Sequence, residues 1–524
     1  MLKKYLGLAG SFILIDLILV FFNWKGFLPL ENLSSFALIA GVLILLAFYF
    51  PREFFWFFLT VLPLENVFLL SENFPISLKL YQLCAVVLFL GLILRRITKQ
   101  EKIFLANFFW HKENRKVSFN WLNWGVLSWL GFFSLGGILN GFSRTENWKW
   151  FLILGSFIFI FFLAQKFFQT FQEKAEGLYF FLNGWIVVWL VGFYQALAQK
   201  LNWQAFVVMD GRINGTFLEP DWLGIYIAFC LGLLLGLKIF LTNWKNGKKL
   251  FWGQTELPKI YNRFLNIKIC FLGGLLALTV SRSAWVASLI IVFVYGFLLI
   301  RLSKKNFWQS IKEIGLVIVL LGLSFGIVSL TRLSNFDFLN RAASTINGEQ
   351  KITVSCQKNI PLPEKINNLD ELDKLECRHI NLEEIEREKQ AGFFIKEVNR
   401  PDPNVNIRKN IYFTIIQEIK RHPWLGQGWG ASSRILGQDE KGNGLNASNI
   451  FLEIWLATGM VGLFSFLVVL LLAGKIVLSL PKEIQSFFWL SGIAFFLANL
   501  FNAGIFSGFF WVWLASINFN KNND

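Results

Sequence analysis

The sequence has 524 residues, of which 55% are hydrophobic, 17% are aromatic and only 16% are charged. Soluble globular proteins carry about 25% charged residues, so a chain with 60 Phe and 22 Trp is not an ordinary soluble protein. The net charge of +16 would suit a nucleic-acid-binding protein, but the basic residues gather in loops between apolar runs, so no nucleic-acid partner is expected.

Apolar runs of membrane-spanning length recur along most of the chain. A helix that crosses lipid needs about 20 mostly apolar residues, because lipid offers no partner to an unpaired backbone group. Fourteen runs approach this length: 5–22, 35–50, 53–70, 78–95, 121–141, 149–167, 177–198, 222–241, 266–280, 283–301, 312–331, 447–474, 484–503 and 506–517. Because the last run is short and the 35–70 region is ambiguous, we expect an all-α, polytopic transmembrane helical bundle of 12 to 14 spans.

Basic loops orient these runs. The first run follows Lys3 and Lys4 and precedes no clear cleavage site, so we expect a retained first span with a cytoplasmic N-terminus. Basic residues are concentrated in 95–116, 245–268 and 301–312, and with fourteen spans all three segments fall on the cytoplasmic side. The same arrangement places 141–149, 199–221 and 332–446 outside the cytoplasm.

The sequence divides into helices over 1–331, a large extracytoplasmic loop over 332–446 and C-terminal helices over 447–517. We expect the middle of the loop, about 345–405, to be poorly structured, because prolines interrupt it at Pro361, Pro363, Pro401 and Pro403. Apolar residues at helical spacing then predict an amphipathic helix over about 409–420: Ile411, Ile415, Ile416 and Ile419. The turn-forming run RHPWLGQGWG (421–430) ends it.

Cysteines and histidines indicate no metal site. Cys356 and Cys377 both fall in the loop, where a disulfide is possible in an oxidising compartment, although the sequence leaves their pairing open. The other cysteines, Cys84, Cys230 and Cys270, lie in or beside spans and are expected to be packing residues. With three His residues and no Cys-x-x-Cys pair, we expect no metal and no cofactor.

Charged residues at the outer ends of spans are the candidates for function, because a charge at membrane depth is costly. Residues 211–224 carry Arg212 and Glu219, and residues 279–285 carry Arg282. Two guanidinium groups meeting at this level would suit a phosphate ligand. Snorkelling of both arginines to lipid headgroups is the simpler alternative. In 444–463, Glu453 is the acidic residue that we expect to be buried.

Three segments, in this order, resemble the O-antigen ligase and O-antigen polymerase-like superfamily of bacterial membrane glycosyltransferases. The resemblance covers about 205–475, with only hydropathy matching before it. The first segment is Arg-x-x-Gly-Thr-Phe, the second is Ser-Arg-x-Ala-Trp, and the third is a His-Pro-x-x-Gly-x-Gly-x-Gly run followed by a Gly-x-x-Gly span. The residues concerned are Arg212, Gly215, Thr216, Phe217, Ser281, Arg282, Ala284, Trp285, His422, Pro423, Leu425, Gly426, Gly428, Gly430, Asn449, Leu452, Gly459 and Gly462.

The resemblance implies a reaction in the bacterial cytoplasmic (inner) membrane. The donor is a glycan on undecaprenyl diphosphate, and the glycan passes to a hydroxyl group on the periplasmic side. The acceptor is a lipid A-core in ligases and another lipid-linked unit in polymerases. By position, Arg212 and Arg282 would hold the diphosphate and stabilise the leaving group without a metal. Partners are therefore a lipid-linked glycan donor, a glycan or lipid acceptor and membrane lipids.

One departure concerns the catalytic base. Many ligases of the family have His-Asn where this chain has Ser448-Asn449, and a serine hydroxyl is a poor base near neutral pH. Glu219 is our substitute candidate, which tilts the interpretation toward a polymerase. His422, which is more typical of a turn, Ser448 and Asn449 remain candidates for substrate binding.

Two other classes stay open. A polysaccharide transporter or flippase would have internal repeats and charges near mid-membrane, whereas the notable charges here lie at the outer edge. A non-catalytic membrane assembly protein is compatible with the serine at 448.

Overall fold

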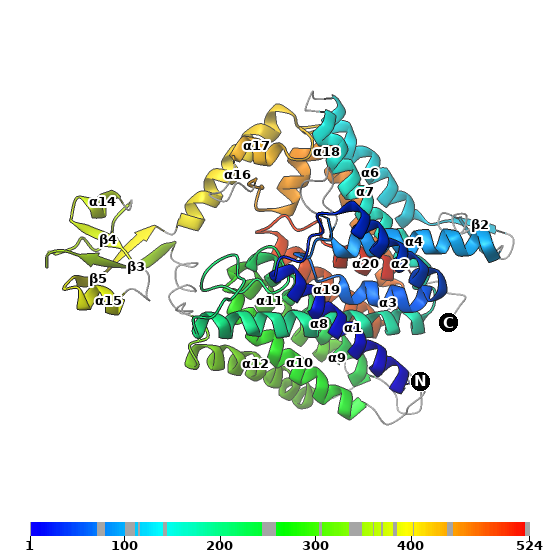
Figure 1. Cartoon of the computed structure of the whole chain (residues 1–524), viewed down its shortest axis with the longest axis horizontal. Helices are drawn as coiled ribbons and strands as arrows, with labels where there is room; N and C mark the ends of the chain where they lie inside the picture. The colour runs from blue at the N-terminus through cyan, green and yellow to red at the C-terminus, as the bar shows by residue number, and fades with distance from the viewer. Residues whose placement is uncertain are drawn as a thin grey trace.

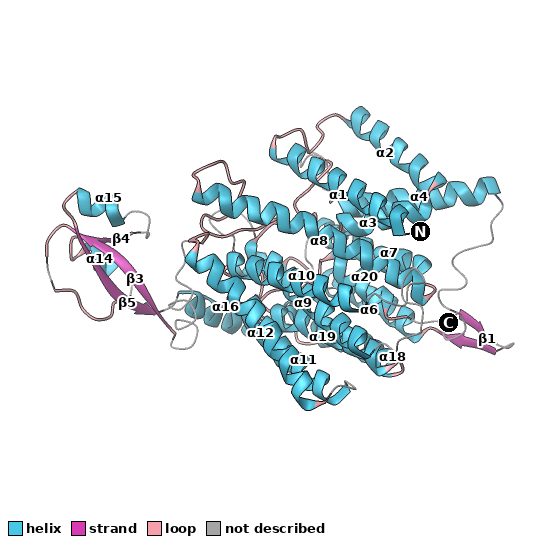
Figure 2. Cartoon of the chain, turned by 90° about the horizontal axis from the view of Figure 1, so that it is seen from below, coloured by secondary structure: helices cyan, strands magenta, loops and turns pink. Residues whose placement is uncertain are grey.

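The structure is a computed structural model that describes residues 2–70, 79–99, 110–113, 116–139, 144–243, 258–302, 306–334, 348–359, 361–367, 370–380, 385–401, 403–437 and 444–518. Most of these residues are helical, and the helices pack into one body (Figure 1). A small β-sheet unit stands off one side of this body in two perpendicular views (Figures 1 and 2). The predicted all-α polytopic fold is confirmed.

The helices before the large insertion form most of the body. They are α1 (Leu2–Trp24), α2 (Leu33–Tyr49), α3 (Pro51–Val61), α4 (Leu80–Lys99), α6 (Trp121–Leu139), α7 (Arg144–Phe167), α8 (Phe171–Lys200), α9 (Pro220–Asn243), α10 (Pro258–Thr279), α11 (Arg282–Leu302) and α12 (Phe307–Leu330). An antiparallel hairpin, β1 (Trp110–Glu113) and β2 (Lys116–Phe119), precedes α6. After the sheet unit come α16 (Pro403–Arg421), α17 (Ala431–Leu436), α18 (Ile450–Leu478), α19 (Lys482–Asn499) and α20 (Gly508–Ser516).

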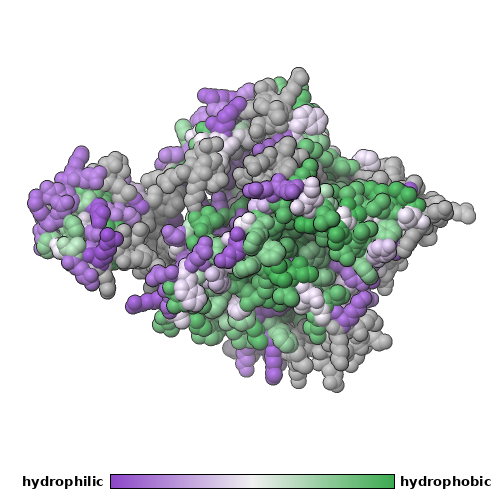
Figure 3. All heavy atoms as spheres, in the orientation of Figure 1, coloured by the Kyte–Doolittle hydropathy of each residue, from purple (hydrophilic) through white to green (hydrophobic). Residues whose placement is uncertain are grey.

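The surface of the helical body is apolar. Within the described part of the chain, nine helices are long and apolar enough to cross a membrane: α1, α4, α6, α7, α8, α9, α11, α12 and α18. Large apolar side chains face outward, among them Leu330 (86% exposed) and Leu471 (72% exposed). Figure 3 shows hydrophobic residues spread over the body, whereas the sheet unit is largely hydrophilic. Such an exposed apolar surface is stable in lipid and not in water.

Two of the predicted spans are only partly helical. The expected helix over 53–70 is wrong in its second half, because α3 has 11 residues and the chain from 62 to 70 is not helical. The free backbone finds partners elsewhere: Thr216 donates its hydroxyl to the Pro63 carbonyl at 2.6 Å, and the Asn66 N–H donates to the Thr216 carbonyl at 2.9 Å. Similarly, α20 has 9 residues and follows a non-helical stretch. Non-helical backbone at membrane depth requires such protein partners.

Small residues allow the central helices to approach closely. On α9, a Cβ atom at Gly232 would lie 2.6 Å from the Leu490 carbonyl oxygen of α19. A Cβ atom at Gly236 would lie 2.4 Å from the Cα atom of Phe487. Helices in lipid associate through this kind of close backbone packing, so α9 and α19 form the centre of the bundle.

The helical body also buries charges that the sequence interpretation did not anticipate. Glu65 is ion-paired with Lys79 and accepts a hydrogen bond from the Tyr81 hydroxyl at 3.2 Å. Lys238, which is fully buried, pairs with Glu313 at 3.0 Å. The expectation that the notable charges lie at the outer edge is therefore incomplete. Apolar neighbours hide these residues in a hydropathy profile, and each charge is balanced by a residue distant in sequence.

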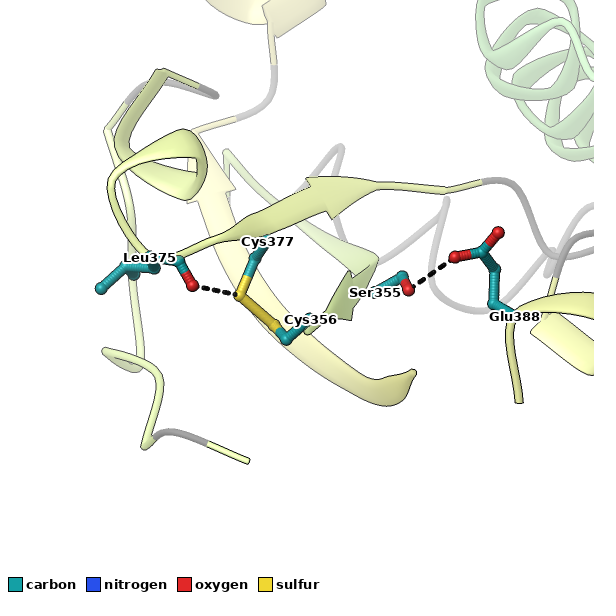
Figure 4. The surroundings of a disulfide bond; sticks show 5 residues. All are labelled: Ser355, Cys356, Leu375, Cys377 and Glu388. Carbon is teal, nitrogen blue, oxygen red and sulfur yellow. Dashed lines mark hydrogen bonds between the residues drawn. A yellow bond between two sulfur atoms is a disulfide. The ribbon is translucent and has the colours of Figure 1, made fainter. Parts of the chain in front are cut away.

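The insertion contains a folded sheet unit, so the expectation of a poorly structured middle is wrong for the described residues. Strands β3 (Glu349–Cys356), β4 (Cys377–His379) and β5 (Phe394–Pro401) form an antiparallel sheet in the order β4-β3-β5, with short helices α14 (Asp370–Asp373) and α15 (Ile385–Gln390). Ile352, Val354 and Cys356 alternate along β3 and enter a small core with Val398. A Cys356–Cys377 disulfide joins β3 to β4 (Figure 4). The disulfide and the alternation of apolar and polar residues along β3 stabilise a folded unit despite the prolines.

Acid is expected to loosen the sheet unit through Glu388. The Ser355 hydroxyl donates a hydrogen bond to its carboxylate at 2.8 Å, and this bond, with help from Arg378 at 2.6 Å, lowers the pKa of Glu388 (Figure 4). A carboxyl group with a lowered pKa in the folded state stabilises that state above its unfolded pKa of about 4.3. The stabilisation is lost as the pH falls through the lower folded pKa.

Reduction of the Cys356–Cys377 disulfide by a phosphine can measure this loosening in the full-length protein. We expect the reduction rate of the wild type to rise toward that of Glu388→Gln as the pH falls from neutral to below about 4. The Gln variant controls for the pH dependence of the reductant. Parallel pH profiles for the two proteins would contradict a stabilising role for the ionised Glu388.

Candidate functional site

The turn between α10 and α11 organises one end of the bundle. Helices leave their last carbonyl groups without partners, and here the segment after α8 supplies them. Arg212 donates from Nε to the Thr279 carbonyl at 2.9 Å, and the Ile213 N–H donates to the Leu278 carbonyl at 3.3 Å. The positive guanidinium group also suits the negative end of the α10 dipole. Arg212 is thereby held against Thr279, which lies three residues before Arg282 in the sequence. Arg212 is therefore at the same end of the bundle as the start of α11.

Arg212 is ion-paired with the first turn of α9. Its Nη2 atom lies 3.0 Å from Oδ1 of Asp221, and the two side chains are 15% and 33% exposed. Asp221 also accepts a hydrogen bond from Ser281 and is attracted by Arg408. Glu219 is half-buried just before α9, and its carbonyl accepts the Leu223 N–H at 3.2 Å. Glu219 thus lies two residues from Asp221, at the start of the helix.

Arg282 is the first residue of α11 and is half-buried. The hydroxyl oxygens of Ser281 and Ser283 lie 3.3 Å apart on either side of it, and Asn502 donates to Ser283 at 3.3 Å. The start of α11 touches α9 closely, because a Cβ atom at Gly224 would lie 2.8 Å from the Ala284 Cβ atom. Arg212 thus contacts the end of α10 at Thr279, and Arg282 begins α11 three residues later.

The segment between α19 and α20 joins this network to the insertion. The Leu500 carbonyl accepts hydrogen bonds from the Asn449 side chain at 3.0 Å and from the Tyr412 hydroxyl at 3.4 Å. The next residue, Phe501, has the guanidinium group of Arg408 over its ring at 5.5 Å. The residue after that, Asn502, reaches Ser283. Residues 500–502 thus connect α11, α16 and the start of α18.

Arg408 is the residue that sequence reasoning missed. Helix α16 begins at Pro403, earlier than the predicted 409, and its buried apolar face includes Ile411, Ile415 and Ile419, as predicted. Ile416, the fourth apolar residue of the predicted stripe, is 41% exposed. Arg408 lies one turn before Tyr412 on the side that contacts the bundle. A lone arginine on the apolar stripe of an amphipathic helix was the available signal.

Ser448 and Asn449 form the start of α18. The Asn449 side chain accepts the N–H groups of Phe451 and Leu452 at 2.9 and 3.1 Å, which is the geometry of an N-cap. Ser448 has a φ of 49°, and its carbonyl accepts the Tyr412 hydroxyl at 3.1 Å. The structure therefore gives Asn449 a structural role and leaves Ser448 half-buried beside Tyr412. Glu453 is buried, as predicted, and accepts from Ser432 at 2.7 Å.

His422 is exposed directly after the end of α16 and precedes the glycine loop, residues 423–430. This loop is inserted into a break in α18. At the break, Gly459 has a φ of 67° and a ψ of −173°, a conformation open almost only to glycine. Gly426 faces it, since a Cβ atom there would lie 2.5 Å from the Gly459 nitrogen. The glycines of the motif thus serve close backbone packing, about 14 Å along α18 from its start.

The glycine loop replaces the helical hydrogen bonds that the break removes. The N–H groups of Met460 and Val461 donate to the carbonyls of residues 423 and 424 at 2.8 and 3.2 Å. In return, the N–H groups of Gln427 and Gly428 donate to the carbonyls of residues 456 and 457 at 2.8 and 2.9 Å. Four backbone groups of α18 are thereby satisfied inside the bundle. This interlock fixes the end of α16, and with it Arg408 and Tyr412.

Part of the chain matches a known protein family. Residues 269–467 match the family model described as O-antigen ligase. Over these residues the chain is similar to O-antigen ligases, and we call this stretch the O-antigen ligase domain. This domain runs from α10 to the first half of α18 and contains Arg282, Arg408 and the glycine loop, whereas Arg212 and Glu219 precede it. A search of curated proteins finds no match to the chain. The superfamily resemblance expected from the sequence is confirmed.

The O-antigen ligase domain, together with Arg212, creates a site suited to an anion. The guanidinium groups of Arg212 and Arg408 and the N-terminus of the 21-residue helix α11, which begins at Arg282, lie at one end of the bundle. The Asp221 carboxylate accepts from Arg212 and is attracted by Arg408, and Glu219 lies two residues before it. Arginine pairs with phosphate oxygens through its planar fork of donors, and helix N-termini favour negative charge. A diphosphate group is therefore the kind of ligand that this site can hold.

Proposed function

We propose that the chain is an inner-membrane glycosyltransferase that transfers glycans from undecaprenyl diphosphate to a hydroxyl acceptor. The convergence of Arg212 and Arg282 on the α10–α11 turn carries this proposal. Both arginines lie at the end of the bundle from which the insertion emerges, because the turn, the start of α9 and residues 500–502 are joined by hydrogen bonds. The bias of basic residues toward cytoplasmic loops supports a periplasmic position for this end.

In the proposed reaction, Arg212 and Arg282 bind the diphosphate of the donor, and Arg408 adds a third cation. The acceptor hydroxyl oxygen forms a bond to the anomeric carbon while the bond from that carbon to the diphosphate breaks. Negative charge then grows on the leaving diphosphate, and fixed cations stabilise it more strongly than they stabilise the bound donor. Arg212, which pairs with Asp221 in the resting site, would exchange this carboxylate for the phosphate.

Glu219 is the proposed base for the acceptor hydroxyl. It lies two residues before Asp221, so a carboxylate at the start of α9 stands next to the proposed phosphate site. Ser448 lies on another wall with Tyr412, where it would contact the acceptor. His422 and Asn449 are proposed as outer contacts of the glycan. Asn449 would contribute less, because its side chain already accepts two backbone N–H groups at the start of α18. The glutamate tilts the proposal toward a polymerase rather than a ligase.

The transporter alternative gains one observation, which is the fully buried Asp16 in α1. Buried acids at mid-membrane are typical of transport pathways. Against it, Glu65 is paired with Lys79 and Lys238 with Glu313, and such pairs can be purely structural. The enzyme therefore remains the leading proposal.

A glycan profile of a deletion strain tests the proposed function. Accumulation of single lipid-linked repeat units would indicate a polymerase, and accumulation of polymer still on its lipid carrier would indicate a ligase. Complementation with wild-type protein should restore full-length glycan, whereas Glu219→Gln should restore at most about 1% of it, since general bases contribute about 100-fold or more. Asp210→Asn, an exposed acidic residue in the same connecting segment, is the matched control. An unchanged profile on deletion would refute the proposal.

A further inference from the structure

The last turn of α10 has a hydrogen-bond donor for each of its last four carbonyl groups. Its final carbonyl groups, from Leu276 to Thr279, all accept hydrogen bonds. The indole of Trp285 donates to Leu276 at 2.8 Å, and the Val280 N–H donates to the carbonyl of residue 277 at 3.1 Å. The donors to Leu278 and Thr279 are Ile213 and Arg212. The turn is thereby fastened to α11 on one side and to the proposed phosphate-binding segment on the other.

Val280 lies at the centre of this turn in an unfavourable backbone conformation. Its φ is 53°, in the left-handed region that β-branched residues rarely adopt. Glycine or asparagine would be the ordinary choice for such a position. The Val280 side chain is nevertheless 2% exposed, so it is buried inside the protein. Burial of the isopropyl group therefore holds the backbone in a conformation that the residue itself disfavours.

We propose that Val280 is a positioning residue for the phosphate site. Its buried side chain anchors the left-handed turn that points the Thr279 carbonyl at Arg212 and starts α11 at Arg282. Without that anchor, the backbone at residue 280 would relax toward a favoured region of φ and ψ. The positions of Arg212 and Arg282 relative to each other would then no longer be fixed. This inference rests on the proposed function for its ligand, but the conformation of the turn can be tested independently.

The stability of Val280 variants tests the turn. At most buried positions, alanine is tolerated better than glycine, because glycine has greater freedom in the unfolded chain. At Val280 we expect the reverse order: thermal unfolding of detergent-solubilised Val280→Gly should occur at a higher temperature than that of Val280→Ala, with both below wild type. Val292, buried in the middle of α11, supplies the control, where alanine should be the more stable variant. A more stable Val280→Ala would overturn the anchored left-handed turn.

Ligand binding tests the positioning role. Farnesyl diphosphate and farnesyl monophosphate serve as probes, measured well below the unfolding temperatures. We expect Val280→Ala to weaken diphosphate binding about tenfold, a loss of about 1.4 kcal/mol, with little change for the monophosphate. Val280→Gly should bind between Val280→Ala and wild type, and Val292→Ala should keep the wild-type ratio between the probes. A purely structural loss would lower both affinities alike.

The two outcomes separate the proposals. If wild-type protein does not prefer the diphosphate, the proposed function fails, while the order of stabilities still decides the conformation of the turn. If wild type prefers the diphosphate and Val280→Ala keeps that preference, the positioning role of Val280 is wrong and the proposed function stands.

Discussion

Gly459→Ala is expected to destabilise the protein more than any other single methyl group added to α18. With a φ of 67° and a ψ of −173°, residue 459 occupies a region that costs a non-glycine residue about 1–3 kcal/mol. A Cβ atom there would also lie 2.2 Å from the Trp424 carbonyl carbon, which is backbone and cannot rotate away. Overpacking adds about 1–3 kcal/mol, so we expect a total loss of about 2–6 kcal/mol.

The loss should appear as lower yield and an earlier thermal transition of the solubilised protein. Gly474→Ala is the matched control, because it lies on the same helix and its added Cβ would meet only Trp489 at an ordinary 3.5 Å. Alanine is favoured over glycine in a helix interior by about 1 kcal/mol, so this control should be neutral or stabilising. Equal transitions for Gly459→Ala and Gly474→Ala would show that the glycine loop does not occupy the break in α18.

Arg282→Ala is expected to lower glycan transfer about 100-fold or more while leaving the amount of folded protein unchanged. Removing one donor to a developing negative charge commonly costs this much in rate. Arg282 is half-buried at the start of α11, beside Ser281 and Ser283, so the change removes charge without opening the core. Arg282→Lys should recover only part of the activity, because an ammonium group cannot contact two phosphate oxygens as a planar fork does.

Arg301→Ala provides the matched control for Arg282. It removes the same charge from the other end of α11, where Arg301 is exposed and lies over the Phe297 ring at 6.0 Å. Product formation from a lipid-linked donor, measured with protein in lipid nanodiscs, should be near the wild-type rate for this variant. If Arg282→Ala and Arg301→Ala were equally active, Arg282 would be a snorkelling residue with no part in the reaction.

Hydropathy predicted most of the helices because a membrane makes their composition nearly uniform. The same uniformity hid the broken span, since residues 53–70 are apolar whether helical or extended. Pro63, followed by Glu65 and Asn66, was the local signal for the end of α3. The sheet unit was also readable in part, because Ile352 and Val354 alternate with polar residues. The prediction of a poorly structured segment relied on the prolines and did not use this alternation.

Two arginines of the candidate site, Arg212 and Arg282, were named from the sequence, whereas Arg408 and the contacts of the site were not. A charged residue near the end of an apolar run identified Arg212 and Arg282. The partner of Arg212 on α10 could not be predicted, because a backbone carbonyl such as that of Thr279 carries no sequence signature. The position of Arg408 could not be predicted without knowing how α16 packs against the bundle. That packing depends on contacts with Ser448 and Leu500, which are distant in sequence.

The interlock between the glycine loop and α18 also imposes an order on biosynthesis. Residues 423–428 provide the partners for backbone groups at the break, and they emerge from the ribosome before α18 does. With the insertion outside the cytoplasm, as we propose, it must be exported before α18 can close around the loop. Until then, the unpaired amides and carbonyls at the break remain costly in lipid. The bundle can therefore be completed only after the exported segment has folded back onto α18.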